Sequence, residues 1–249
     1  MMYLSHLMID VGSNPDRPRP GRLWLRNIYH VHQRLSMAFP SRGSEQNDPQ
    51  FLRPFDPANF ERPKFLFRID HDNQENSPRQ FVLVLSDLLP NWAYAFQNAD
   101  MFLAALPELR EYQPNQQAGD VLRFRIKVNL SVKSKEHRKP KEGWEGTKKD
   151  QGKRVALTWD EGQQPADVVI PWFANKAVRN GFAVQKCELI QLGWVGGFKP
   201  GRDSAFQFRA AQLEGILQVT DAERFKQAVC QGIGSAKAFG FGLLSVARM

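Results

Sequence analysis

The sequence predicts an α+β fold of two tandem ferredoxin-like units, and three observations lead to this class. The first hundred residues show the element order β-α-β-β-α, which is the order of a ferredoxin-like unit. The second half of the chain repeats a similar order. It ends with the clearest pattern in the sequence, an alternating strand into Thr220 followed by a helix, a glycine-rich loop and a last strand. We therefore expect domains over 1–110 and 115–249, joined near 105–118.

The first unit is predicted from apolar periodicity and turn signals. In its helix, apolar residues recur every three or four positions from Trp24 to Phe39, and Pro40 ends the pattern. Two strands flank a turn-rich spacer and predict a hairpin. The elements expected here are a strand at 3–10, a helix at 23–39, strands at 64–70 and 79–87, and a partly helical segment at 91–103.

The second unit is predicted in the same way. A long strand precedes a charged, glycine-bearing loop at 134–153. A helix ends at Gly181, and Pro171 suggests that its regular part begins near that residue. The elements expected here are strands at 119–132 and 153–157, a helix at 165–181, hairpin strands at 182–195 and 205–220, a helix at 221–231 and a strand at 243–247.

The net charge of +8 is concentrated in one segment. From Leu122 to Arg154 there are twelve Lys and Arg against four Asp and Glu, so this segment carries the whole excess. A solvated basic loop and a nucleic-acid-binding patch both have this composition, and composition leaves the two open.

Several classes of protein are disfavoured. The composition, with 42% apolar and 24% charged residues, is that of a globular protein. No segment resembles a signal peptide or approaches the roughly 18 apolar residues of a membrane span, so no membrane partner is expected. Cys187 and Cys230 lie far apart without metal-ligand spacing, which predicts neither a zinc site nor a disulfide and favours a cytoplasmic location.

The tail CQGIGSAKAFGFGLLSVARM holds four glycines between Gly232 and Gly242. It matches neither the dinucleotide fingerprint nor the phosphate-binding P-loop, because the order here is helix, loop, strand. Two interpretations stay open. The glycines can let backbone N–H groups approach phosphates, with Lys237 adding a charge, or they can permit tight packing at a crowded turn.

Three segments together carry a resemblance to a known family: MYLSHL, IYHVHQRLSMAFP and QGIGSAKAFGFGLLSV. GDVLRFRIKVNLSVKS, GKRVAL and FRAAQLEGILQVTD also fit its pattern, whereas 41–63 and 134–151 do not. The chain resembles the CasE-type CRISPR repeat endoribonucleases of subtype I-E, and the tail is the most specific part of the match.

The resemblance implies two tandem ferredoxin-like (RRM-like) βαββαβ domains and a metal-independent endoribonuclease without a cofactor. It implies binding to the CRISPR repeat RNA hairpin and cleavage of precursor crRNA at the 3′ base of the stem. Attack by the 2′-OH leaves a 2′,3′-cyclic phosphate and a 5′-OH. The enzyme then stays bound to the crRNA beside other Cascade subunits.

The family's helix motif places a histidine and a tyrosine at His32 and Tyr29. Residues three apart share a helix face, and a histidine can donate or accept a proton near neutral pH. The resemblance implies that His32 is the general acid or base and that Tyr29 orients or polarises the reacting groups. Without it, a surface histidine on an amphipathic helix would be favoured. His30 points elsewhere and is assigned no role.

The resemblance also implies a set of RNA-binding residues on the second unit. Leu130 stands where the family commonly has proline. The implied residues are Lys127, Lys133, Lys153, Arg154, Gly232, Gly234, Lys237, Gly240 and Gly242. Two alternatives remain: a non-catalytic RNA-binding structural subunit of a CRISPR ribonucleoprotein, and a basic ferredoxin-like enzyme for an anionic small molecule.

Overall fold

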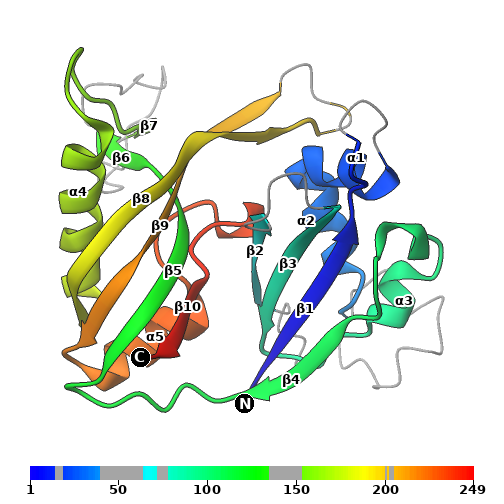
Figure 1. Ribbon diagram of the computed structural model, residues 1–249, viewed down its shortest axis with the longest axis horizontal. Helices are drawn as coiled ribbons and strands as arrows, with labels where there is room; N and C mark the ends of the chain where they lie inside the picture. Colours follow the sequence, from blue (N-terminus) through cyan, green and yellow to red (C-terminus); the bar gives the residue numbers. More distant parts are fainter. Residues whose placement is uncertain (15–18, 40–63, 72–77, 135–152, 200, 202–204) are drawn as a thin grey trace, which may run out of the picture.

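The computed structural model describes residues 1–14, 19–39, 64–71, 78–134, 153–199, 201 and 205–249. Two four-stranded antiparallel sheets stand side by side, and helices cover each of them (Figure 1). There are two hydrophobic clusters: one lies within the first unit, and the other fills the second unit and includes Leu66 and Leu85 of the first sheet. In the described residues, none of the helices has the length and apolar character that a membrane crossing requires.

The first sheet has the strand order β2-β3-β1-β4. Its core forms between the inward face of β1 and helix α2, where Leu7, Val31 and Leu35 are fully buried. The elements are β1 Met2–Asp10, α1 Pro20–Arg26, α2 Ile28–Ser36, β2 Phe65–His71, β3 Arg79–Ser86, α3 Trp92–Phe96, the 3-10 helix η1 Asp100–Phe102, and β4 Glu108–Tyr112.

The second sheet has the strand order β10-β5-β9-β8, and a separate two-stranded sheet pairs β6 with β7. The elements are β5 Val121–Asn129, β6 Ser131–Ser134, β7 Lys153–Ala156, α4 Pro165–Arg179, β8 Phe182–Gly197, β9 Phe206–Val219, α5 Ala222–Gln231, the 3-10 helix η2 Lys237–Phe239, and β10 Leu244–Arg248. Apart from β6 and β7, both units follow the order βαββαβ, so the predicted fold class is confirmed.

The prediction of one helix over 23–39 is wrong, because α1 ends at Arg26 and α2 begins at Ile28. Asn27 between them has extended backbone angles, φ −109° and ψ 98°. Its side-chain oxygen accepts from the N–H of Tyr29 at 3.2 Å and from the N–H of Phe198 at 3.2 Å. Its amide donates to the Phe198 carbonyl at 3.1 Å. Asn27 therefore caps α2 and fixes it to the end of β8.

The strand predicted over 119–132 is also divided, because β5 ends at Asn129 and β6 begins at Ser131. Leu130 is fully buried between them. Its N–H donates to the Arg209 carbonyl at 2.7 Å, and its own carbonyl accepts from the N–H of Leu157 at 3.0 Å. These bonds satisfy the backbone while the chain leaves the second sheet to pair with β7.

Helix α4 begins at Pro165, as expected for the helix at 165–181, so the suggestion that its regular part begins near Pro171 is wrong. Pro165 sits in the first turn, where a missing N–H is tolerated, and the Pro171 ring is exposed to solvent. Strand β4 was not predicted because its side chains are mostly exposed and lack apolar alternation, although it pairs with β1. We propose the domain boundary in the connection between β4 and β5.

Candidate functional site

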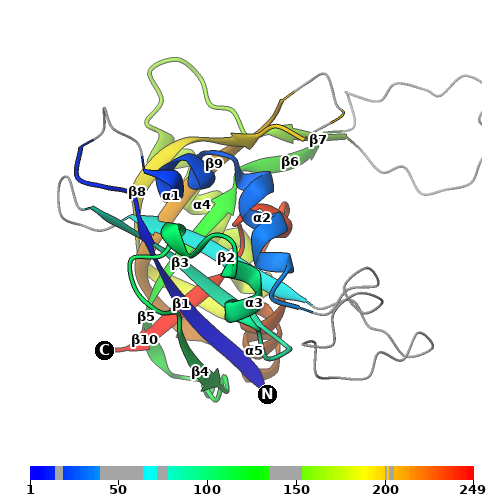
Figure 2. The ribbon, with the colours of Figure 1, turned by 90° about the vertical axis from the view of Figure 1, so that its right-hand side faces the viewer.

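His32 lies where helix α2 crosses strand β2 and meets the glycine-rich loop (Figure 2 shows α2 beside β2). Its imidazole stacks on Phe65 at 5.3 Å between ring centroids, with the planes 20° apart. Phe67 lies 6.5 Å away, and Phe239 of η2 lies 6.3 Å away. We call Phe65, Phe67 and Phe239 the aromatic bed. It fixes the ring plane of His32 and joins it to a loop that is distant in the sequence.

The orientation of His32 determines which nitrogen can react. The side chain is half-buried, and its Nδ1 atom is inaccessible to solvent. In this conformation Nε2 is therefore the ring nitrogen left for any proton transfer. The turns that carry the ring are firmly anchored, because Val31 and Leu35 are fully buried in the first core.

Tyr29 lies one turn earlier on α2, at the end of the helix that Asn27 caps. The ammonium of Lys199 lies 5.7 Å from the centre of the Tyr29 ring. The ring centroid of His30 is 6.2 Å from that of Tyr29, and His30 is exposed. Tyr29 thus stands beside the end of the β8–β9 hairpin, whereas His32 stands over β2.

The glycines of the tail adopt backbone angles that favour glycine. Their φ values are 74° at Gly232, 90° at Gly234, 80° at Gly240 and 86° at Gly242. A Cβ at Gly232 would lie 2.8 Å from Leu66 of β2, and one at Gly242 would lie 2.6 Å from a carbonyl oxygen of the loop itself. At Gly234 a Cβ would meet no atom of the described residues within 4 Å. Packing explains the crowded glycines, and Gly234 alone of these four leaves its backbone open to a ligand.

Gly240 offers a test of this packing. A Cβ at this position would lie 3.2 Å from Cε2 of Phe67, in the aromatic bed. Alanine at position 240 would make that close contact and would also be strained, because Gly240 has a positive φ. We therefore expect Gly240→Ala to lower the free energy of unfolding by about 1–3 kcal/mol, measured by urea denaturation. Gly234→Ala is the matched control, since it adds strain without a contact. Equal losses in the two variants would contradict a packing role for Gly240.

A polar cluster ties the loop to the basic hairpin β6–β7. The Ser235 hydroxyl accepts from the Asn129 amide at 3.2 Å and shares a hydrogen bond with the Ser131 hydroxyl at 2.9 Å. Arg154 donates to the Ser131 hydroxyl at 3.5 Å. Lys133 pairs across the strands with Arg154, so both point to the same face of the hairpin, and both are exposed. Lys133 and Arg154, two of the basic residues predicted to bind RNA, thus lie close to the glycine-rich loop.

The other predicted lysines are placed differently. Lys153 begins β7 opposite Ser134. Lys127 of β5 points between the two sheets, where burial lowers its pKa, Asp70 opposes that shift and Arg68 adds to it. Burial also lowers the pKa of Lys237, which is half-buried in η2. Lys127 is therefore separate from the basic face of the β6–β7 hairpin.

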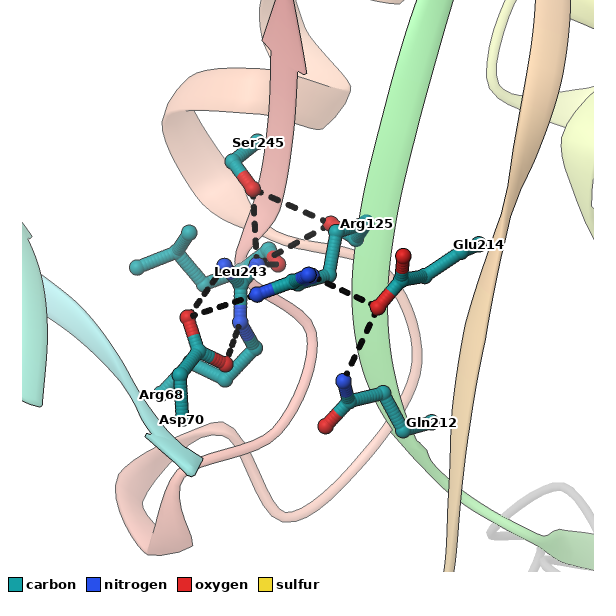
Figure 3. Close-up of polar contacts among 7 residues, drawn as sticks. All are labelled: Arg68, Asp70, Arg125, Gln212, Glu214, Leu243 and Ser245. Carbon is teal, nitrogen blue, oxygen red and sulfur yellow. Dashed lines mark hydrogen bonds and ion pairs between the residues drawn. The ribbon is translucent and has the colours of Figure 1, made fainter. Parts of the chain in front are cut away.

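A buried ionic network, which sequence reasoning missed, joins the two sheets at this point (Figure 3). Arg68 of β2 is 2% exposed and holds both carboxylate oxygens of Asp70, at 2.6 and 2.7 Å. It also donates to the carbonyls of Arg125 at 3.0 Å and Leu243 at 3.2 Å, and to the Ser245 hydroxyl at 2.8 Å. The strand beneath His32 is thereby fixed to the exit of the glycine-rich loop.

The second carboxylate of this network lies on β9. Arg125 pairs with Glu214 at 2.7 Å and approaches Asp70 at 3.9 Å. Gln212 donates to the same Glu214 oxygen at 3.1 Å. The signal available in the sequence was the pair of charges inside the otherwise apolar strand FLFRIDH.

The fold and the site define a protein of two tandem ferredoxin-like domains with a histidine at their junction, beside a glycine-rich loop and a basic hairpin. The chain belongs to the CRISPR associated protein family, whose model matches residues 2–248. Its relatives confirm the CasE-type resemblance.

Two curated relatives match over their full lengths. The chain is 28% identical over 256 residues to "CRISPR-associated endoribonuclease Cse3" of Thermus thermophilus, covering 99% of this chain and 100% of that protein. It is 25% identical over 249 residues to "CRISPR system Cascade subunit CasE" of Escherichia coli, covering 100% of both.

Two solved structures of Cse3 are also similar. Cse3 bound to 19 nt RNA has a TM-score of 0.68 at 26% identity, covering 98% of this chain and 99% of that one. Thermus thermophilus Cse3 bound to an RNA representing a pre-cleavage complex has a TM-score of 0.67 at 25% identity, covering 99% and 98%.

Proposed function

We propose that this protein is an endoribonuclease that binds the CRISPR repeat hairpin, cleaves precursor crRNA at the 3′ base of the stem and retains the product. Membership of the family and the relatives named as endoribonucleases support this reaction class. The observation that carries it in this chain is the position of His32, held by aromatic rings against the glycine-rich loop.

The reaction that we propose needs no metal ion. The 2′-OH attacks the adjacent phosphorus, the bond to the 5′-oxygen breaks, and the products carry a 2′,3′-cyclic phosphate and a 5′-OH. One proton leaves the 2′-oxygen and one reaches the 5′-oxygen. His32 transfers one of these protons through Nε2, and Tyr29 orients the reacting groups.

The negative charge that develops on the phosphate during cleavage is stabilised by groups of the glycine-rich loop. The open backbone at Gly234 and the ammonium of Lys237 are the groups we assign to the phosphate at the cleavage site. Lys133, Lys153 and Arg154 on the β6–β7 hairpin bind phosphates of the stem, since the major groove of an RNA helix is too narrow for side chains to read. Lys127 is also assigned to RNA binding, from its position between the two sheets.

We also propose that the protein works in the cytoplasm beside other Cascade subunits. A relative is named as a Cascade subunit. Cys187 and Cys230 are both unpaired thiols, as expected in a reducing compartment.

The test is to incubate the protein with synthetic repeat hairpins in EDTA and to map the ends of the products. We expect a single cut at the 3′ base of the stem, with a 5′-OH on one product and a cyclic phosphate on the other. A requirement for Mg²⁺, or a 5′-phosphate on the product, would contradict the mechanism. Tight hairpin binding without any cut would instead favour the non-catalytic RNA-binding subunit.

A further inference from the structure

The glycine-rich loop contains a strained turn at a residue that is not glycine. Ala236 has φ 59° and ψ 32°, and it is the one non-glycine residue with a positive φ in the part of the chain that the structure describes. A residue with a Cβ adopts this left-handed conformation only where its surroundings hold it there. Ala236 directly precedes η2, so whatever holds this turn also decides where η2 lies.

The turn at Ala236 sets the position of two residues that the proposed reaction uses. The loop after α5, drawn in red in Figure 1, carries η2 across to β2. There the N–H of Phe239 donates to the Ala236 carbonyl at 2.8 Å. The Phe239 ring lies 6.3 Å from His32 and 5.2 Å from Phe208, between ring centroids. If the backbone at Ala236 changed conformation, both Phe239 and Lys237 would move.

Ser235 supplies the contacts that hold this turn on its other side. Its half-buried hydroxyl accepts from the Asn129 amide at 3.2 Å and shares a hydrogen bond with the Ser131 hydroxyl at 2.9 Å. Asn129 ends β5 and Ser131 begins β6, so both partners belong to strands. Gly234, the preceding residue, has no comparable packing, because a Cβ there would meet no described atom within 4 Å. Ser235 is therefore the anchor next to the strained residue.

The same hydrogen bonds connect the loop to the basic hairpin β6–β7. Ser131 is 8% exposed, so its hydroxyl depends on protein partners. A hydroxyl can donate one hydrogen bond and accept two, which lets Ser131 bond Ser235 and also accept from Arg154 at 3.5 Å. A polar chain thus runs from Arg154 through Ser131 and Ser235 to the turn at Ala236. Residues that we assign to the RNA stem and to the cleaved phosphate share this chain.

We propose that Ser235 is a positioning residue for cleavage. Its hydroxyl holds the turn at Ala236, and with it Lys237 and Phe239, in register with an RNA stem bound at Arg154. The inference rests on the proposed function, since it assumes that the stem binds the β6–β7 hairpin and that His32 transfers a proton. Ser235 touches no reacting atom, so it should affect the rate of cleavage more than the affinity for RNA.

The test measures cleavage and binding of the repeat hairpin separately. Ser235→Ala is expected to slow single-turnover cleavage at saturating protein by about 10- to 100-fold, because small displacements of positioned groups are costly in rate. The affinity for a hairpin with a 2′-deoxy nucleotide at the cleavage site, which cannot be cut, should stay close to that of the parent. The pH dependence of the rate should keep its shape, since His32 is unchanged.

Two further substitutions at the same position separate the hydroxyl from the fold. Threonine and valine have nearly the same shape, and only threonine carries a hydroxyl. Ser235→Thr should therefore cleave close to the parental rate, whereas Ser235→Val should be as slow as Ser235→Ala. This comparison decides the question even if Ser235→Ala does not fold.

Ser86→Ala is the matched control. Ser86 is fully buried in the first unit, and its hydroxyl donates to the Leu88 carbonyl at 2.8 Å. This variant loses one hydroxyl hydrogen bond away from the loop, so it should be less stable to urea and still cleave at the parental rate.

A double-mutant cycle tests the connection to the hairpin. Arg154→Ala and Ser235→Ala interrupt the same polar chain. At saturating protein, their combined loss of rate should therefore be smaller than the product of the two single losses.

Four outcomes would overturn the inference. Ser235→Ala could cleave at the parental rate, or its affinity for the hairpin could fall as much as its rate. Ser235→Val could cleave as fast as Ser235→Thr, or the two losses in the cycle could simply multiply. Failure of the parent to cut any repeat hairpin would be a different result, because it would contradict the proposed function and not the role of Ser235 alone.

Discussion

Replacing His32 with alanine is expected to slow cleavage of the repeat hairpin by at least about 10²–10⁴-fold, the usual contribution of a positioned acid or base. Binding of the RNA hairpin should change little, because we propose that the β6–β7 strands and the glycine-rich loop, not His32, hold the stem. Single-turnover cleavage and a filter-binding assay on the same RNA measure the two effects separately.

His30→Ala is the control for this experiment, because His30 is on the same helix but exposed. It should cleave at close to the parental rate. Tyr29→Phe should show an intermediate loss if the hydroxyl orients the reacting groups. Parental activity in His32→Ala, or a loss confined to His30→Ala, would remove His32 from the mechanism.

The position of His32 shows where sequence reasoning succeeded and why. The periodic apolar residues of α2 predict a helix, and they leave His32 off the buried stripe. The half-burial of its ring on Phe65 and Phe67 was not predicted, because the contacts of β2 with α2 are tertiary and have no local pattern. The contact of His32 with Phe239 was not predicted either, because the two residues lie far apart along the chain.

The errors in the fold have a common physical cause. The helix over 23–39 has an unbroken apolar stripe, but Asn27 gains three hydrogen bonds by leaving the helix, two of them to Phe198. Leu130 likewise gains bonds to Arg209 and Leu157 when the strand is divided. In both places a residue distant in the sequence compensates the break, and periodicity within one segment carries no information about such a partner.

The glycine-rich loop illustrates a different limit. Its four glycines between Gly232 and Gly242 have positive φ values, which glycine adopts without steric cost. Composition could not separate phosphate binding from packing. The structure gives packing roles to Gly232 and Gly240, which face β2, whereas Gly234 faces open space.

The largest effect on stability is expected at Arg68. Replacing Arg68 with methionine leaves Asp70, which is 8% exposed, without the two strongest hydrogen bonds to its carboxylate. Removing one partner of a buried ion pair costs about 3–5 kcal/mol, because the other charge remains desolvated. We expect a loss of this size in the free energy of unfolding, measured by urea denaturation with both fluorescence and circular dichroism.

A double substitution separates the ion pair from the rest of the network. Arg68→Met with Asp70→Leu should recover part of the loss, since replacing both members of a buried pair by apolar residues is often neutral. Lys186→Met is the control, because Lys186 and Glu188 form a pair on the surface and their separation should have no measurable effect. Equal stability of all variants would show that the buried pair is unimportant.

The double variant should also reveal whether Arg68 positions the active site. Arg68 donates to the Leu243 carbonyl at the exit of the glycine-rich loop, and its neighbour Phe67 lies beneath His32. Methionine cannot make that bond, so the loop and the aromatic bed lose a direct link even when stability returns. Cleavage by the double variant should therefore remain below the parental rate while hairpin binding recovers, and full recovery of both would assign Arg68 to stability alone.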